Sequence, residues 1–342
     1  MAVTNVTAAR KAPIQVPCPW HQEEMQRLME QHAQRRLPHA LLLSGAAGTG
    51  KQRLAQSLAQ TLLCQRPVGE LACGQCDACH LSAAGTHPDL HTLGPEGDSR
   101  AIKIDQVRRL MDFCARTAHY DGARLALIAP AEALNRNAQN ALLKTLEEPG
   151  EGLVLILVSH QPSLLLPTVR SRCQRRHLPL PELASALRWL SPQVGEGQAP
   201  ALLAAARGAP LRAAALQEAE WFTARDRLVG QLLAVAQGRA SPSQAAQVLA
   251  AFEPRIMAEV IYVWLARAAR LAALGEGDQA GAGEGHDPLV EPALAQLARA
   301  VPAGRLLRVA QRVMEGRRRL LAGANPNKEL LMEDWLLALA HL

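Results

Sequence analysis

The sequence predicts an α/β domain built on a parallel, five-stranded sheet, followed by a small helical domain and an all-helical C-terminal domain. Two observations lead to this fold class. Short apolar runs alternate with segments of helical spacing up to about residue 180, and only helical spacing follows. A glycine-rich loop also follows the first apolar run directly. Strands that alternate with helices are typical of a parallel sheet covered on both faces.

The predicted strands are short apolar runs, and the predicted helices carry apolar residues on one stripe. The strands are expected at 40–43, 90–93, 125–128 and 153–158, with a weaker fifth strand near 177–178. Helices are expected at 20–36, 53–63, 105–116 and 135–146, with Asp105 as the N-cap of the third and Pro149 just beyond the fourth.

These elements divide the chain into four parts. Residues 1–19 carry three prolines and predict a flexible tail, and 20–180 form the α/β domain with a cysteine-containing insertion at 64–79. We expect a small helical domain at 181–220 and a larger all-helical domain at 221–342, which the family resemblance given below implies are a lid and an oligomerisation collar. A break at 191–200 and a junction at 208–210 divide the helices, and the Gly- and Glu-rich stretch 275–287 predicts a surface loop.

Composition narrows the compartment and the partners. The 342 residues carry a net charge of +6, which is compatible with an acidic or nucleic-acid partner but does not require one. No run approaches the roughly 18–20 apolar residues of a membrane span, and the N-terminus lacks the apolar segment of a signal peptide. We therefore expect a cytoplasmic protein without a membrane partner, whose seven cysteines are reduced.

The loop after the first strand has the pattern of a phosphate-binding loop. Gly45, Gly48, Gly50 and Lys51 fit G-x-x-x-x-G-K between a strand and a helix, where backbone N–H groups and a lysine can bind phosphates. A working loop continues with Ser or Thr, whose hydroxyl binds Mg²⁺, and here the residue is Gln52. The pattern predicts a degenerate nucleotide site that can still hold ATP or ADP.

The acidic residues of an ATPase are also missing. The strand 125–128 runs into Ala129 and Pro130, where a hydrolysing enzyme places the acids that hold Mg²⁺ and activate water. Glu132 lies beyond the proline and is interpreted as a charge at a helix N-terminus rather than a metal ligand. We therefore expect no intrinsic ATPase activity.

Four cysteines predict a structural metal site. Cys64, Cys73, Cys76 and Cys79 have the spacing C-x8-C-x2-C-x2-C, which lets four thiolates surround one Zn²⁺. Four sulfur ligands leave no open coordination position, so the zinc would be structural. A redox pair would use only two of the four. Cys18, Cys114 and Cys173 stand apart and are expected to be buried.

Arg172 has two interpretations. An arginine at a domain edge is usually a solvated charge. Alternatively it is an arginine finger, which reaches the γ-phosphate of ATP bound to a neighbouring subunit and can raise the rate by about 10³–10⁵.

Three sequence strings favour the second interpretation. They are Leu-Pro-His-Ala-Leu-Leu-Leu at 37–43, Asn-Ala-Leu-Leu-Lys-Thr-Leu-Glu-Glu-Pro at 140–149 and Ser-Arg-Cys at 171–173. With the cysteine insertion and Gly-Thr-His-Pro-Asp at 85–89, the chain resembles the delta-prime subunits of bacterial DNA polymerase III clamp loaders, in the AAA+ clamp-loader family. The resemblance is dense over 20–180 and weaker afterwards.

This resemblance implies a function within a complex. Clamp loaders of this family join gamma/tau and delta subunits with delta-prime and place a sliding clamp on primer-template DNA as part of the polymerase III holoenzyme. The resemblance implies that this chain is a stator which does not hydrolyse ATP and which donates Arg172 to its neighbour. Active relatives also direct an arginine at their own nucleotide, and Leu211 takes that place here, with Arg212 one residue away.

Two other functions remain open at the level of sequence. The chain could be an active clamp-loader ATPase of the gamma/tau type, against which Ala129 and Pro130 argue. It could also be a DNA-binding zinc protein that acts alone. Against this, its basic residues are dispersed, and the densest run, Arg317-Arg318-Arg319, is explained by a solvated helix face.

Overall fold

The computed structural model describes residues 14–97, 99, 101–120, 122–218, 221–274, 290–321 and 326–340. It divides into two compact units, Met1–Ser185 and Ala186–Leu342, and each is described here by itself. Within the described ranges, no helix is long and apolar enough to cross a membrane.

The first unit contains a five-stranded sheet in which all neighbouring strands are parallel, in the order β2-β3-β4-β1-β5. This confirms the predicted parallel, five-stranded sheet. The strands are β1 (Ala40–Ser44), β2 (Leu90–Leu93), β3 (Arg124–Ile128), β4 (Leu153–Ser159) and β5 (Gln174–His177). The sequence placed the fifth strand too late because β5 is a mostly exposed edge strand whose polar residues give no hydropathy signal.

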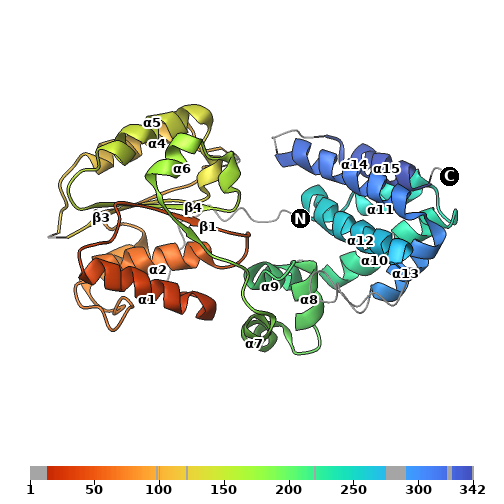
Figure 1. Ribbon diagram of the computed structural model, residues 1–342, viewed down its shortest axis with the longest axis horizontal. Coiled ribbons are helices and arrows are strands. Elements are labelled where there is room, and N and C mark those ends of the chain that lie inside the picture. Colours follow the sequence, from red (N-terminus) through yellow and green to blue (C-terminus); the bar gives the residue numbers. More distant parts are fainter. Residues whose placement is uncertain are drawn as a thin grey trace. The chain divides into compact units, whose positions relative to one another are not determined.

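Helices cover both faces of this sheet. They are η1 (Pro19–His21), α1 (Gln22–Ala33), α2 (Lys51–Leu63), α3 (Asp77–Ala84), α4 (Ile104–Cys114), η2 (Ala131–Ala133), α5 (Arg136–Glu147), η3 (Pro162–Leu164) and α6 (Pro167–Arg172). Figure 1 shows α1 and α2 on one face and α4, α5 and α6 on the other.

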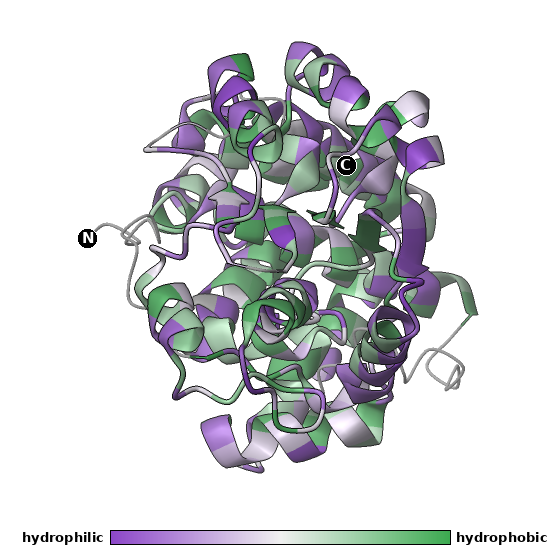
Figure 2. Cartoon of the chain, turned by 90° about the vertical axis from the view of Figure 1, so that its left-hand side faces the viewer, coloured by the Kyte–Doolittle hydropathy of each residue, from purple (hydrophilic) through white to green (hydrophobic). Residues whose placement is uncertain are grey.

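The core follows from the alternation of side chains along the strands. Leu42 and Leu155 point to the face covered by α4 and α5, whereas Leu41 and Ile156 point to the face covered by α1 and α2. Because β1, β3 and β4 lie inside the sheet and are covered on both faces, all their residues are buried. Bands of hydrophobic and hydrophilic residues on the covering helices are visible in Figure 2.

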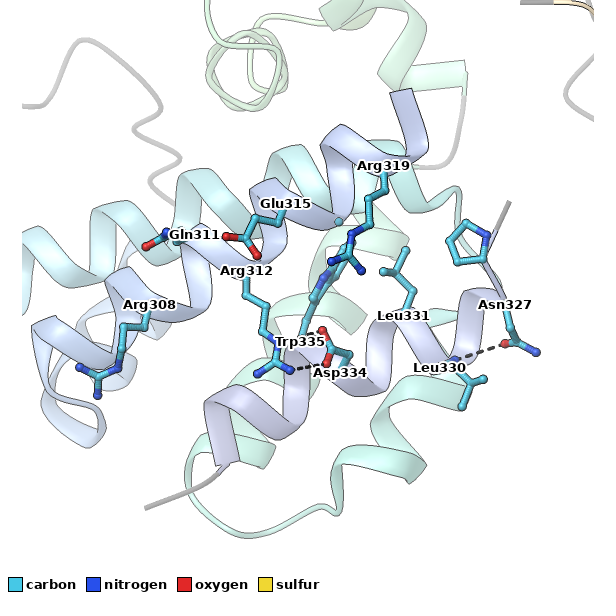
Figure 3. A pocket seen from close by; sticks show the side chains of 12 residues that line it. Arg308, Gln311, Arg312, Glu315, Arg319, Asn327, Leu330, Leu331, Asp334 and Trp335 are labelled. Atoms are coloured by element: carbon cyan, nitrogen blue, oxygen red, sulfur yellow. Dashed lines mark hydrogen bonds and ion pairs between the residues drawn. The ribbon is translucent and has the colours of Figure 1, made fainter. Parts of the chain in front are cut away.

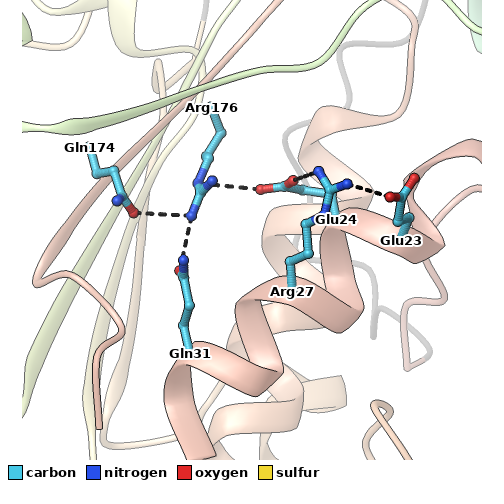
Figure 4. A network of polar contacts seen from close by, with 6 residues as sticks. All are labelled: Glu23, Glu24, Arg27, Gln31, Gln174 and Arg176. Carbon is cyan, nitrogen blue, oxygen red and sulfur yellow. Dashed lines mark hydrogen bonds and ion pairs between the residues drawn. The ribbon is translucent and has the colours of Figure 1, made fainter. Parts of the chain in front are cut away.

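Polar contacts hold α1 against the edge strand β5 (Figure 4). The Arg176 guanidinium donates to Gln31 Oε1 at 3.0 Å and pairs with Glu24 at 3.4 Å between Nε and Oε1. Arg27 pairs in turn with Glu23 and Glu24. Charged side chains on an edge strand also discourage pairing with a strand of another chain.

One local prediction for this unit was wrong. Asp105 is not the N-cap of α4, because Lys103 holds that position and its backbone N–H donates to the Gln106 side chain at 2.9 Å. Within the predicted tail, the Gln15 N–H donates to Gln60 Oε1 at 2.7 Å, and the flexibility of residues 1–19 stays a prediction. Residues 1–13 of the predicted tail lie outside the described residues.

The second unit is helical. It contains α7 (Leu183–Val194), which begins just before it, and α8 (Ala199–Ala205), α9 (Pro210–Glu218), α10 (Trp221–Ala236), α11 (Pro242–Leu249), α12 (Pro254–Leu274), α13 (Glu291–Ala300), α14 (Ala303–Leu321) and α15 (Lys328–Ala340). The predicted junction at 208–210 is confirmed between α8 and α9. The predicted break at 191–200 begins too early, because α7 keeps Pro192 and ends at Val194.

One hydrophobic cluster runs through this unit, from Ala186 in α7 to Leu339 in α15. It therefore includes residues of both the predicted lid (181–220) and the predicted collar (221–342), and that division stays a prediction. The predicted loop at 275–287 lies outside the described residues.

Candidate functional site

The site lies where the carboxyl ends of three parallel strands meet. Ser44 at the end of β1 pairs with Ser159 at the end of β4, and Ile128 at the end of β3 pairs with Leu157. The segments that follow these strands therefore share one edge of the sheet: the phosphate loop after β1, Ala129-Pro130 after β3 and His160 after β4. This is the edge at which parallel α/β sheets bind ligands.

Three glycines shape the phosphate loop. Gly45 has a φ of +148°, and a Cβ on it would lie 2.2 Å from the carbonyl oxygen of Leu178. The backbone after β5 approaches this closely because the Leu178 N–H donates to the Ser44 carbonyl oxygen at 2.8 Å. Gly48 and Gly50 have φ of +78° and +92°. The glycines are therefore required by the backbone whether or not a phosphate binds.

Lys51 is turned inward onto its own loop. It is 1% exposed, and its Nζ donates to the carbonyl oxygen of Ala46. The Thr49 hydroxyl donates to the same oxygen at 3.1 Å, and the Trp20 indole Nε1 donates to the Thr49 carbonyl oxygen at 2.8 Å. The loop thus holds itself closed, and a phosphate would have to displace the Lys51–Ala46 contact.

Burial opposes the charge of Lys51 more strongly than the Glu132 carboxylate supports it. Burial lowers the pKa of Lys51 to about 8, although the Glu132 carboxylate acts in the opposite direction. Burial, and next the charge of Lys51, lowers the pKa of His21 to about 4. The same two causes lower the pKa of His160, and Glu132 opposes them. Both histidines are therefore neutral at pH 7.

The residues beside the phosphate loop differ from those that the sequence analysis expects in an ATPase. Gln52 is exposed at the start of α2, and the apolar Ala129 and Pro130 follow β3. Glu132 lies in the first turn of η2, as expected, but its carboxylate also accepts from the His160 N–H at 3.0 and 3.2 Å. A carboxylate is therefore present at this edge, committed to the backbone after β4.

Sequence reasoning missed the contribution of Trp20, His21 and His160 to this site, and for Glu132 it missed the contact with His160. Only the pairing of β1 with β4 places His160 near Lys51, and only the packing of η1 brings Trp20 to the loop. No motif in the sequence signals either contact.

The four predicted metal ligands come together. The sulfur atoms of Cys64, Cys73, Cys76 and Cys79 all lie within 4.8 Å of one another. Sγ–Sγ distances are 3.8 Å for Cys64–Cys76, 3.9 Å for Cys73–Cys79 and 3.6 Å for Cys64–Cys79. A tetrahedral Zn²⁺ with Zn–S bonds of about 2.3 Å separates its sulfurs by about 3.8 Å, so the cluster fits zinc.

Backbone donors and packing complete the cluster. The Cys73 N–H donates to Cys64 Sγ at 3.2 Å and the Gln75 N–H to Cys73 Sγ at 3.5 Å, contacts that favour thiolates. Cys76 lies just before α3 and Cys79 within it, and Ile14 packs against the cluster.

The other three cysteines are buried, as expected. Burial raises the pKa of Cys114 and of Cys173 to about 11, so both thiols are protonated at pH 7. Burial also raises the pKa of the Cys18 thiol, with Arg53 acting in the opposite direction. Protonated, buried thiols are poor nucleophiles and poor metal ligands.

Arg172 is the last residue of α6, and its side chain is 35% exposed. Its Nη1 donates to the Thr168 carbonyl oxygen at 3.1 Å, and its Nη2 pairs with Glu147, the last residue of α5. The guanidinium therefore lies at the surface of the α/β domain, within reach of a neighbouring molecule.

Arg212 is held within the helical unit. It pairs with Glu259 of α12, which also pairs with Arg317 of α14. Burial, then the nearby cations Arg317 and Arg207, lowers the pKa of Arg212. The Arg212 charge is thus used to join α9 to α12 and α14. Of the arginine run 317–319, only Arg318 and Arg319 are the solvated charges that were expected.

A groove of about 640 Å³ lies between α14 and α15 (Figure 3). Its apolar part includes Leu330, which is 65% exposed, and its rim carries Arg308 and Arg319. Arg312 and Asp334, also in the groove, pair with each other at 2.7 Å.

Comparisons with known proteins agree with these features. Residues 20–182 match the family model described as "DNA polymerase III, delta subunit", and 219–341 match "DNA polymerase III, delta subunit, C terminal". DNA polymerase III subunit delta' of Yersinia pestis is 37% identical over 94% of this chain and 94% of its own length. The subunit of the same name from Escherichia coli K12 is 35% identical over 94% and 95%. That of Pseudomonas aeruginosa is 50% identical over 57% of this chain and 60% of its own length.

The strand order, the phosphate loop between β1 and α2 and the four-cysteine cluster define a P-loop α/β protein with a site that fits zinc. Within that class, the chain belongs to the DNA polymerase III delta' subunit family.

Proposed function

We propose that this chain is a non-hydrolysing stator subunit of the DNA polymerase III clamp loader. It assembles with gamma/tau and delta subunits, helps to load the sliding clamp on primer-template DNA, and donates Arg172 to the ATP site of its neighbour. Relatives named as delta' subunits of DNA polymerase III over nearly their whole length support a role in that complex.

One observation carries the non-hydrolysing part of the proposal. The loop keeps its lysine, but the groups needed to place Mg²⁺ and activate water are replaced by Gln52, Ala129 and Pro130. Glu132 is bonded to the His160 N–H, and Arg212 is bonded to Glu259. Both side chains thus have structural partners within the chain.

Nucleotide binding without hydrolysis remains part of the proposal. Gly45, Gly48, Gly50 and Lys51 form the phosphate-binding loop at the N-terminus of α2, where backbone N–H groups favour anions. Binding of ATP or ADP would require Lys51 to leave Ala46. Because burial lowers the pKa of Lys51 to about 8, a bound phosphate would also raise that pKa again.

The alternative is an active ATPase of the gamma/tau type. Two observations favour it: DNA polymerase III subunit tau of Escherichia coli is 36% identical over 143 residues, 22% of its own length, and Glu132 carries a carboxylate to the phosphate-loop edge. Steady-state ATPase assays of the isolated chain separate the two, with an active gamma/tau subunit as the positive control. We expect ATP turnover at the background level for both the unaltered chain and Lys51→Ala. Turnover above background that Lys51→Ala abolishes would establish the alternative.

The helical unit is proposed to hold the complex together. The groove between α14 and α15 exposes Leu330 next to charged side chains of both signs, the composition of a surface that a partner helix can cover. Reconstitution with gamma/tau and delta subunits tests this assignment and the partners together. A complex that forms and loads clamps equally well without this chain would contradict the proposal.

A further inference from the structure

The pairing of Arg172 with Glu147 is notable because the acid stands in an unfavourable place. Glu147 is the last residue of α5, where the helix dipole disfavours negative charge, whereas Arg172 ends α6, where the dipole favours positive charge. The Glu147 charge therefore does not serve its own helix. Its partner in the structure is the arginine.

We propose that Glu147 is a positioning residue, which holds Arg172 back while the subunit is not engaged with its neighbour. The phosphate of the neighbour's ATP must then displace Glu147 from Arg172. This inference rests on the proposed function, in which Arg172 is the group that reaches that phosphate. It adds a regulator to the same site: an acidic side chain of this chain that competes with ATP for the guanidinium.

The contacts of Arg172 explain how the competition works. A guanidinium has five N–H donors, and the structure uses one nitrogen for the Thr168 carbonyl oxygen and the other terminal nitrogen for Glu147. The Thr168 contact lies within α6 and can persist while the arginine points outward. The Glu147 carboxylate is different, because it occupies a terminal nitrogen that a phosphate would use and partly neutralises its charge.

The exposure of the pair makes the contact reversible. The side chains of Arg172 and Glu147 are 35% and 49% exposed, and an ion pair so open to water is weak. A phosphate carries more charge than one carboxylate and binds arginine through two parallel hydrogen bonds. The pair can therefore restrain the free arginine without preventing its engagement.

The test is single-turnover ATP hydrolysis by the reconstituted loader, assembled with gamma/tau and delta subunits and given primed DNA and clamp. Glu147→Gln should raise the rate about two- to fivefold, the range that an exposed ion pair corresponds to. Glu147→Asp, which keeps the charge, should behave like the unaltered protein. Glu148→Gln removes an equal charge from the next residue and is the matched control, expected to change nothing.

Two further measurements of the hydrolysis rate, at raised salt and in a double variant, distinguish this role of Glu147 from a merely structural one. The advantage of Glu147→Gln should disappear as NaCl is raised from about 50 mM to about 0.5 M, because salt screens an exposed pair. In the Arg172→Ala background, Glu147→Gln should have no effect. Gel filtration confirms that each complex is intact.

The outcomes distinguish this inference from the proposed function. If Arg172→Ala leaves hydrolysis unchanged in an intact complex, the arginine finger itself is refuted. If Arg172→Ala depresses hydrolysis but Glu147→Gln equals the unaltered protein or lowers the rate, only the role of Glu147 is refuted. A gain from Glu147→Gln that persists without Arg172 also refutes it.

Discussion

Replacing Glu259 by glutamine should destabilise the helical unit, because two arginines depend on that carboxylate. Glu259 of α12 pairs with Arg212 of α9 and with Arg317 of α14. Glutamine keeps the shape of the side chain and can accept hydrogen bonds, but it removes the negative charge. The change would leave two guanidinium groups close together without the anion that separates them.

The burial of the three side chains sets the size of the effect. Arg212, Glu259 and Arg317 are 27%, 17% and 21% exposed. Removing one partner of a fully buried pair costs about 3–5 kcal/mol, whereas exposed pairs contribute about 0–1 kcal/mol. For this intermediate burial we expect a loss of about 2–3 kcal/mol in the free energy of unfolding. In a unit of this size that corresponds to a fall of roughly 5–10 °C in Tm.

Urea unfolding followed by tryptophan fluorescence measures this loss. Trp264 and Trp335 are buried in the helical unit, so their emission reports on its unfolding, which need not coincide with that of the α/β unit. Asp334→Asn is the matched control, because it breaks a pair with Arg312 whose side chains are 53% and 43% exposed. This control should cost no more than about 0.5–1 kcal/mol.

Single arginine substitutions complete the experiment. Arg212→Gln and Arg317→Gln each leave Glu259 with one cation, so each should cost less than Glu259→Gln. If Glu259→Gln costs no more than Asp334→Asn, the reasoning is refuted, and the three side chains contribute no more than surface charges.

Two further predictions concern the α/β unit. Elemental analysis should find one zinc per chain, and Cys76→Ser should remove it. Cys114→Ser, which changes a buried thiol outside the cluster, is the control and should keep the zinc. A fully folded chain without metal would rule the site out. Because the pKa of His21 is lowered to about 4, the unfolded chain binds a proton between pH 6.5 and 4 that the folded chain does not. His21 should therefore lower the stability of the α/β unit by up to about 3 kcal/mol as the pH falls through this window. His21→Leu should remove that part of the dependence in urea titrations at pH 7, 5.5 and 4.5.

Much of the α/β unit could be predicted from local sequence because its elements follow short-range rules. The buried strands are visible in the sequence as apolar runs. The N-cap of α5 is Asn135, whose side chain accepts from the Ala138 N–H at 2.8 Å, and the glycines mark a loop that needs positive φ. The cysteine spacing likewise indicates a metal site before any distance is known. Such patterns are set by residues within a few positions of one another.

Other features could not be predicted because they depend on contacts between distant segments. The edge strand β5 has polar residues and is defined by its pairing with β1. The start of α4 differed from prediction for another reason: it is set by a local contact between Lys103 and Gln106 that the apolar pattern does not show.

The amino-acid sequence alone shows that Gln52 follows the phosphate-loop lysine and that Ala129 and Pro130 follow β3, the substitutions from which we propose that the chain does not hydrolyse ATP. How the charged groups nearby are used became visible only from the contacts between distant segments. Parallel pairing of β1, β3 and β4 brings Glu132 and His160 to Lys51, and helix packing joins Arg212 to Glu259. A missing chemical group can be recognised from the residue at a single sequence position. The partner of a charged side chain, in contrast, depends on which distant segments the fold brings together.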